Sequence, residues 1–126
     1  MATELPIVRE QDFEAAVVFG EHVVMRLSGS SNVGAAAPLQ QLVDRLHSEL
    51  CDASAAEVVV DIVGLEFMNA ACFNVFVAWI GLINELGPER RYRLRFKSNS
   101  TIRWQARSLH TLSCFATDLV SIGEHS

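Results

Sequence analysis

The chain has few cysteines, prolines and glycines, and each shortage excludes a class of protein. Among 126 residues there are three cysteines, three prolines and seven glycines, without repeats or low-complexity tracts. Cys51, Cys72 and Cys114 are odd in number and lack CxxC spacing, which argues against a disulfide framework or a zinc site. We therefore expect free thiols in a reducing compartment.

No segment has the composition of a secretory signal or a membrane span. The N-terminus lacks the basic, apolar and small-residue regions of a signal peptide. The most apolar stretch, residues 68 to 86, is interrupted by Asn69, Asn74, Asn84 and Glu85. Half of the residues are hydrophobic, enough for one domain with its own core. We expect a soluble cytoplasmic protein without membrane contact.

Nothing in the sequence indicates a metal, a cofactor or a catalytic group. The four histidines, at positions 22, 47, 110 and 125, show no metal-ligand spacing. Residues 28 to 32, SGSSN, are small and polar, but they lack the lysine and the glycine spacing of a phosphate-binding P-loop. We therefore expect no enzyme activity, no catalytic residue, no metal and no cofactor.

The basic residues are concentrated in one part of an acidic chain. Seven of the ten Lys and Arg residues lie between positions 90 and 107, although the formal net charge is −5. Four of them alternate with apolar residues, namely Arg91, Arg93, Arg95 and Lys97. This alternation predicts a strand with one face in the core and one in water, paired with acids such as Glu14 or Asp61.

An alternative for these basic residues is an electropositive patch that meets an acidic partner, a nucleotide phosphate or nucleic acid. Only Tyr92, Phe96 and Trp104 supply aromatic rings nearby, and two of them point to the core in the predicted strand. We therefore do not expect nucleic-acid binding.

Apolar periodicity predicts strands that alternate with helices. The expected elements are an antiparallel hairpin over 13–19 and 23–27, a loop over 28–37, a helix from 38 to about 52, a strand over 58–63, a helix from 69 to about 86, a strand over 91–97, a helix capped at 98–100 and ending near 109, and a weak strand over 119–122. The order predicts an α/β fold with a mixed sheet of four to five strands, an N-terminal hairpin followed by parallel strands, and about three helices.

The predicted helix over 69–86 has two apolar stripes, and the second contains Val75, Trp79, Leu82 and Leu86. Two interpretations remain open for this second stripe. Either it is buried under the other helices of the domain, or it is an exposed patch for a partner or a homodimer. Trp79 is the residue that distinguishes them.

The most informative stretch is residues 57 to 73, EVVVDIVGLEFMNAACF. It predicts a buried strand that passes through a short loop into a helix that starts at Asn69, a good N-cap residue. A helix N-terminus presents unpaired N–H groups and partial positive charge. The helix start is therefore the candidate site of the chain.

This element order, with LSG at 27–29, the stretch at 58–73 and a basic strand followed by SNSTIRW, resembles the STAS domain family, whose bacterial members are the anti-sigma factor antagonists. The resemblance covers about residues 13 to 122, so residues 1 to 126 read as one STAS-like domain. The family carries Asp-Ser-Ser-Gly-Leu at the helix start. Here Asn69-Ala70-Ala71-Cys72-Phe73 occupies that place.

The resemblance implies a non-enzymatic regulatory module that binds a protein, such as a kinase-like anti-sigma factor or another signalling regulator. Ala70 falls where the family has the serine that its partner kinase phosphorylates, and alanine has no hydroxyl to take a phosphate. We therefore expect no phosphorylation at this position. The expected partner-binding residues are Ser30, Asn32, Asn69, Ala70, Ala71, Cys72, Phe73 and Trp79.

The alternative is a small-ligand, nucleotide-binding or thiol-dependent domain that uses the loop at 28–32 and Cys72. Ligands of open α/β sheets bind outside the carboxyl ends of the strands, where both features are expected. A cysteine at a helix N-terminus can have a lowered pKa, although a small apolar core side chain is the other interpretation of Cys72.

Overall fold

Six strands form one mixed sheet, in which the order of the strands in space is their order in the chain. The computed structural model describes residues 5, 7–53, 57–116 and 118–124. The strands are β1 (Val8–Glu10), β2 (Phe13–Val18), β3 (Val23–Ser31), β4 (Glu57–Met68), β5 (Arg93–Ser98) and β6 (Val120–Glu124). The α-helices are α1 (Ala36–Ala53), α2 (Ala70–Asn84) and α3 (Arg103–Phe115), and short 3-10 helices are η1 (Val33–Ala35) and η2 (Pro88–Arg90).

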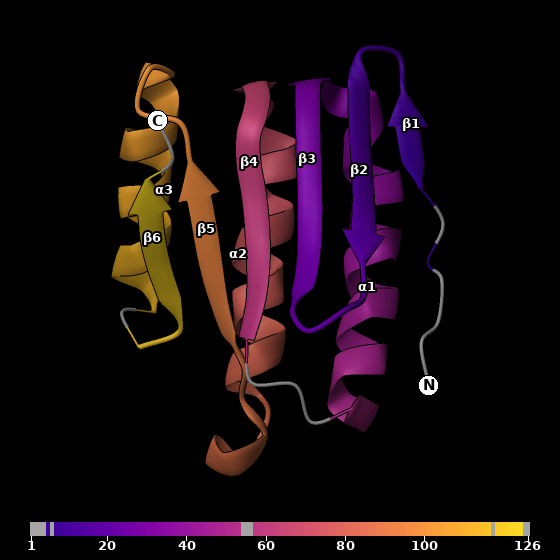
Figure 1. Ribbon diagram of the computed structural model, residues 1–126, viewed down its shortest axis with the longest axis vertical. Coiled ribbons are helices and arrows are strands. Elements are labelled where there is room, and N and C mark those ends of the chain that lie inside the picture. Colours follow the sequence, from indigo (N-terminus) through magenta and orange to yellow (C-terminus); the bar gives the residue numbers. More distant parts are fainter. Residues whose placement is uncertain (1–4, 6, 54–56, 117, 125–126) are drawn as a thin grey trace.

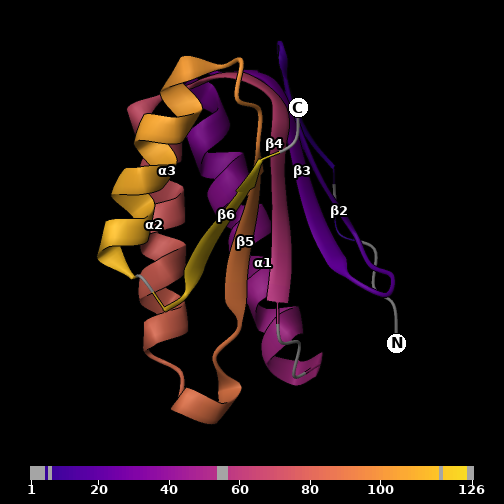
Figure 2. The same ribbon diagram turned by 60° about the vertical axis from the view of Figure 1, so that its left-hand side comes forward.

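The sheet changes from antiparallel to parallel pairing at β3. Strands β1, β2 and β3 pair antiparallel, whereas β3, β4, β5 and β6 pair parallel. Each parallel connection contains one α-helix, and all three helices cover the same face of the sheet (Figures 1 and 2). None of the helices in the described part of the chain covers the other face. The α/β fold with an N-terminal hairpin, parallel strands and three helices is confirmed.

The core lies between the sheet and the three helices. Strand β5 shows why: Leu94 and Phe96 are buried against the helices, whereas Arg93 and Arg95 are exposed on the other face. Alternating side chains point to opposite faces of a strand, so the alternation read from the sequence over 91–97 is confirmed. None of the described helices is long and apolar enough to cross a membrane.

Helix α2 is buried on both of its apolar stripes because it lies between α1 and α3 and also packs on the sheet (Figure 1). Trp79 is 0% exposed and donates a hydrogen bond to the hydroxyl of Tyr92. The interpretation of Trp79 as part of an exposed patch for a partner or homodimer is therefore wrong. The other interpretation, burial within the same domain, is confirmed for Val75 and Trp79, whereas Leu82 and Leu86 are half-buried.

The strands are more numerous than the sequence predicts, and β3 and β4 are longer. The sheet has six strands instead of four to five, because the three-residue β1 pairs with β2. The predicted loop over 28–37 is partly wrong, since Ser28 to Ser31 continue β3 and α1 begins at Ala36. Strand β4 likewise continues through the predicted loop to Met68. The weakly signalled last strand is present as β6.

Helix α3 also differs from its prediction at both ends. It begins at Arg103 and runs to Phe115, beyond the expected end near residue 109. Its N-cap, Ile102, makes no side-chain cap hydrogen bond, so the predicted capping by residues 98–100 is wrong. Asn99 instead accepts hydrogen bonds from the backbone N–H and the hydroxyl of Thr101.

Gly29 allows β3 to pass close to the turn between β1 and β2. It has φ of 85°, and a Cβ at this position would lie 1.6 Å from the backbone oxygen of Asp12. The next residue, Ser30, donates its N–H to that same oxygen at 3.1 Å. Only glycine fits such an approach, and register irregularities flank it in the β3–β4 pairing.

Candidate functional site

The carboxyl ends of β3 and β4 meet at the start of α2, and Ser31 joins the three elements. Ser31 pairs with Met68 in the sheet, and its backbone oxygen accepts the Asn69 N–H at 3.1 Å. Its hydroxyl is buried and lies 3.4 Å from the backbone oxygen of Phe67, to which it donates. From the sequence, Ser31 is one of several predicted loop residues, and no local pattern indicates this structural role.

The helix start at Asn69 is capped as the sequence predicts. Asn69 has an extended backbone, and its side-chain oxygen accepts the Ala71 N–H at 2.7 Å. Ala70, the first helical residue, is exposed, while Ala71 is half-buried. The first turn contains no acidic residue, so the partial positive charge of the helix N-terminus has no neighbouring carboxylate within that turn.

Two side chains near the start of α3 hold the end of β4 in place. Gln105 is fully buried, and its amide nitrogen donates to the backbone oxygens of Ile62 at 2.7 Å and Leu65 at 2.9 Å. Its side-chain oxygen accepts the Asn99 N–H at 2.7 Å. The indole of Trp104 donates to the backbone oxygen of Glu66 at 2.7 Å. The strand that leads to Asn69 is therefore fixed from a distant part of the chain.

An apolar surface lies beside this helix start. Phe67 is 54% exposed, and Phe73 and Met68 are half-buried. Between α2 and α3 there is a groove of about 390 Å³. We call it the docking groove; its lining residues are Met68, Ala70, Phe73, Asn74, Arg107, Ser108 and Thr111. It combines an apolar wall with a cationic side chain and small hydroxyls.

The structure brings Asn32 to the same corner. Its side-chain nitrogen donates to Gln11 at 2.9 Å, its side-chain oxygen accepts the Gly34 N–H at 3.0 Å, and its backbone oxygen lies 3.6 Å from the thiol of Cys72. Ser30 is half-buried and pairs with Phe67 in the sheet. Six of the eight predicted partner-binding residues therefore lie together with some exposed surface: Ser30, Asn32, Asn69, Ala70, Ala71 and Phe73.

Cys72 is not part of that surface, and its predicted role in contacting a partner is wrong. It is 0% exposed, and burial raises the pKa of its thiol, although a hydrogen bond with Ser31 acts in the opposite direction. A buried thiol with a raised pKa is a poor nucleophile. The thiol-dependent alternative is therefore wrong, and the small core side chain is the correct interpretation. Trp79, about two turns further along α2, is also 0% exposed and therefore cannot contact a partner at this surface.

One of the two acids that the sequence suggested, Asp61, lies opposite Lys97 of the basic strand in the sheet, whereas Glu14 pairs with residues of β1 and β3 and not of β5. Glu14 forms an ion pair with Arg9 at 3.2 Å, and Asp61 forms one with Arg26 at 3.5 Å. These are the two ion pairs within 4.0 Å among the side chains that the structure describes. The cationic side chains of β5 therefore form no ion pair within 4.0 Å with a described carboxylate, and they lie on the face of the sheet opposite the helices. The described residues contain no group of three His, Cys, Asp or Glu side chains placed to hold a metal ion.

Comparison with known proteins supports the fold. No family model matches this chain, and no curated protein matches its sequence. Among solved structures, the fold is similar to that in the crystal structure of an anti-sigma factor antagonist from Mycobacterium paratuberculosis, with a TM-score of 0.61. The match covers 90% of each chain at 17% sequence identity. The STAS-like fold expected from the sequence is confirmed.

Proposed function

We propose that this protein is a regulatory module that binds a protein partner through the corner formed by the ends of β3 and β4 and the start of α2. The proposal rests on one observation: an exposed Phe67 and the docking groove adjoin a well-capped helix N-terminus. Exposed apolar surface with a polar rim is typical of protein interfaces. The similar solved structure is that of an anti-sigma factor antagonist, which favours an anti-sigma factor or a related signalling regulator as the partner.

The chemistry of the corner indicates what the partner presents. Phe67 and Phe73 offer apolar area, and Arg107 stands at the α3 side of the docking groove. A partner that fits would insert an apolar side chain next to an acidic one. The unpaired N–H groups at the start of α2 add to the attraction for a carboxylate.

Binding at this corner is constitutive in our proposal, because position 70 cannot carry a phosphate. A phosphoserine there would add about 1.5 to 2 negative charges at the helix N-terminus. The methyl group of Ala70 is exposed and adds none. The regulatory signal would then be the amount of this protein and not its phosphorylation state.

The proposal is tested with Ala70→Asp, which places a permanent negative charge in the docking groove. The probe is an ATP-binding, kinase-like regulator encoded next to this protein, mixed with it and analysed by size-exclusion chromatography and calorimetry. We expect co-elution of the unaltered protein and an affinity lowered about tenfold or more by Ala70→Asp, which corresponds to about 1.4 kcal/mol.

The matched control is Ala78→Asp, an exposed position on the same helix two turns away from its start. It adds the same charge outside the corner and should leave the affinity within about twofold of the unaltered protein. Equal binding by both variants would contradict the proposed surface. Stoichiometric phosphate on Ser28 or Ser30 after incubation with the regulator and ATP would contradict the proposed lack of a switch.

A further inference from the structure

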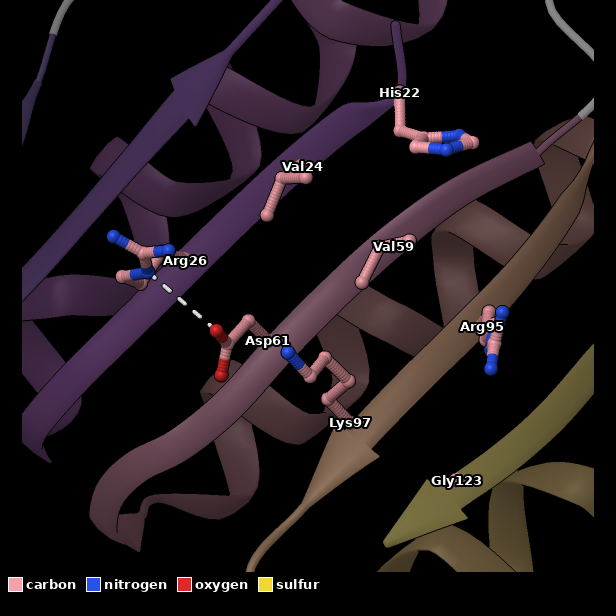
Figure 3. Close-up of a pocket in the computed structure, with 8 residues that line it drawn as sticks. All are labelled: His22, Val24, Arg26, Val59, Asp61, Arg95, Lys97 and Gly123. Carbon is pink, nitrogen blue, oxygen red and sulfur yellow. Dashed lines mark ion pairs between the residues drawn. The ribbon is translucent and has the colours of Figure 1, made fainter. Parts of the chain in front are cut away.

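The face of the sheet that carries no helix contains a hollow over β3, β4 and β5 (Figure 3). We call it the open-face groove. Its volume is about 350 Å³, within the range of small-molecule sites. Its lining residues are His22, Val24, Arg26, Val59, Asp61, Arg95, Lys97 and Gly123. It lies on the opposite face of the sheet from the helices that form the docking groove.

The strand register explains how these side chains come together. Val24 pairs with Val59, and Val59 pairs with Arg95, so these three residues form one row across the sheet. A second row, two residues further along, consists of Arg26, Asp61 and Lys97. Residues two apart on a strand share a face and lie about 6.6 Å apart along it. The first row is apolar with one cation, and the second row is charged throughout.

The single carboxylate that lines the groove, that of Asp61, already has a partner for each of its oxygens. One oxygen of Asp61 lies 3.5 Å from Nε of Arg26, and the other accepts the Val63 N–H at 3.0 Å. Arg95 and Lys97 form no ion pair within 4.0 Å with any carboxylate among the described side chains. Two cationic groups are therefore left uncompensated on one hollow face of a chain whose formal net charge is −5.

Gly123 keeps the side of the groove next to β6 open. It pairs with Lys97, and a Cβ at this position would meet the backbone oxygen of Phe96 at 3.9 Å and Nε of Arg95 at 4.0 Å. Both are ordinary van der Waals distances. A larger side chain at position 123 would therefore fill the groove beside Arg95 without straining the backbone.

We infer that the open-face groove binds a small organic anion with two negative charges and a flat apolar body, of the phosphate monoester class. The phosphate would accept hydrogen bonds from Arg95 and Lys97, since charge-assisted bonds of this kind are the strong ones. The apolar body would lie on Val24 and Val59, with the ring of His22 at the end of the groove. This site shares no lining residue with the docking groove and lies on the opposite face of the sheet, so it is independent of the proposed protein partner.

The experiment uses phenyl phosphate as the probe, titrated into the ¹⁵N-labelled full chain and followed by amide chemical shifts. We expect saturable shifts at residues of β3, β4 and β5 that line the groove. Inorganic phosphate, which lacks the apolar body, and phenol, which lacks the charge, should each bind at least about fivefold more weakly. Absence of saturable shifts, or equal affinity for phenyl phosphate and inorganic phosphate, would overturn the inference.

Three variants locate the site. Arg95→Ser combined with Lys97→Ser should weaken phenyl phosphate binding about tenfold or more. Gly123→Val should weaken it comparably while it leaves every charge in place. Arg103→Ser removes one exposed charge at the start of α3 and should leave the affinity unchanged. An equal loss in Arg103→Ser, or no loss in Gly123→Val, would show general charge attraction and overturn the inference. Amide spectra of each variant without ligand show that it is folded.

Discussion

The indole nitrogen of Trp79 donates a hydrogen bond of 2.7 Å to the hydroxyl of Tyr92 in the core. Since that hydroxyl accepts from Trp79, its own hydrogen is available to Nδ1 of His47, which lies 2.5 Å away. Nε2 of His47 in turn lies 3.7 Å from the sulfur of Cys51. The chain of contacts ties α2, the residue before β5 and α1 together.

Removal of the Tyr92 hydroxyl should destabilise the protein with little change in packing. In Tyr92→Phe, the buried N–H of Trp79 and Nδ1 of His47 both lose their partner, so we expect the free energy of unfolding to fall by about 2 to 4 kcal/mol. Urea unfolding followed by circular dichroism measures the change. Trp79→Phe and the double variant complete a cycle, and additive effects would contradict a shared hydrogen bond.

The stability should also fall in mildly acidic solution because of His47. Burial lowers the pKa of His47, although the carboxylates of Asp44 and Glu85 act in the opposite direction. As the pH falls below the ordinary value near 6.5, the unfolded chain therefore binds the proton before the folded chain does. The stability that neutral His47 contributes is therefore fully present above about pH 6.5. It is lost as the pH falls towards the lower pKa of His47 in the folded state. Unfolding measured between about pH 7.5 and pH 5.5 should show this slope.

The matched variant for this prediction is His47→Gln, which keeps a side chain able to accept from Tyr92 but does not titrate. It should flatten the dependence of unfolding free energy on pH in that range. An unchanged slope in His47→Gln would assign the effect to other groups and contradict the prediction.

Two glycines should respond in opposite directions to the same substitution. Gly29→Ala places a Cβ 1.6 Å from the backbone oxygen of Asp12 at φ of 85°, so we expect a loss of about 2 to 4 kcal/mol. Gly81, in the middle of α2, has no atom within 4 Å of an added Cβ, so Gly81→Ala should gain about 0.5 to 1 kcal/mol. Thermal unfolding of both variants tests the pair. If the melting temperatures of both variants shifted in the same direction and by a similar amount, this backbone argument would be wrong.

The buried amide of Gln105 should be required for the end of β4. Gln105→Leu leaves the backbone oxygens of Ile62 and Leu65 and the N–H of Asn99 without their partner, and we expect a loss of about 2 to 4 kcal/mol. Gln41→Leu, at an exposed position of α1, should stay within about 0.5 kcal/mol. Hydrogen exchange should also increase at residues 63–68 in Gln105→Leu. Unchanged exchange there would contradict the supporting role.

The sequence predicts those features of the fold that depend on local patterns. The alternation in β5, the hairpin of β2 and β3 and the cap at Asn69 each follow from residues that are near one another in the chain. The helical periodicity of α2 was equally clear, but two apolar stripes fit burial under two helices as well as exposure to a partner. Only the positions of α1 and α3 decide that Trp79 is buried.

The remaining features depend on partners that are far apart in the sequence. Ser31 bonds to residues 36 and 38 positions away, and Gln105 reaches residues 40 and 43 positions away. Such hydrogen bonds leave no periodic signal, so residues 64–68 looked like a loop although they continue β4. The same holds for the open-face groove, since the rows that form it exist only once the register of three strands is fixed.

The agreement between strand order and chain order has a consequence for synthesis on the ribosome. Each strand pairs with the one that was translated just before it, so the sheet grows at one edge and no strand has to insert between two that are already paired. Before β6 is added, β5 is the edge of the sheet, and its arginines and lysine disfavour edge-to-edge pairing with the same strand of a neighbouring chain.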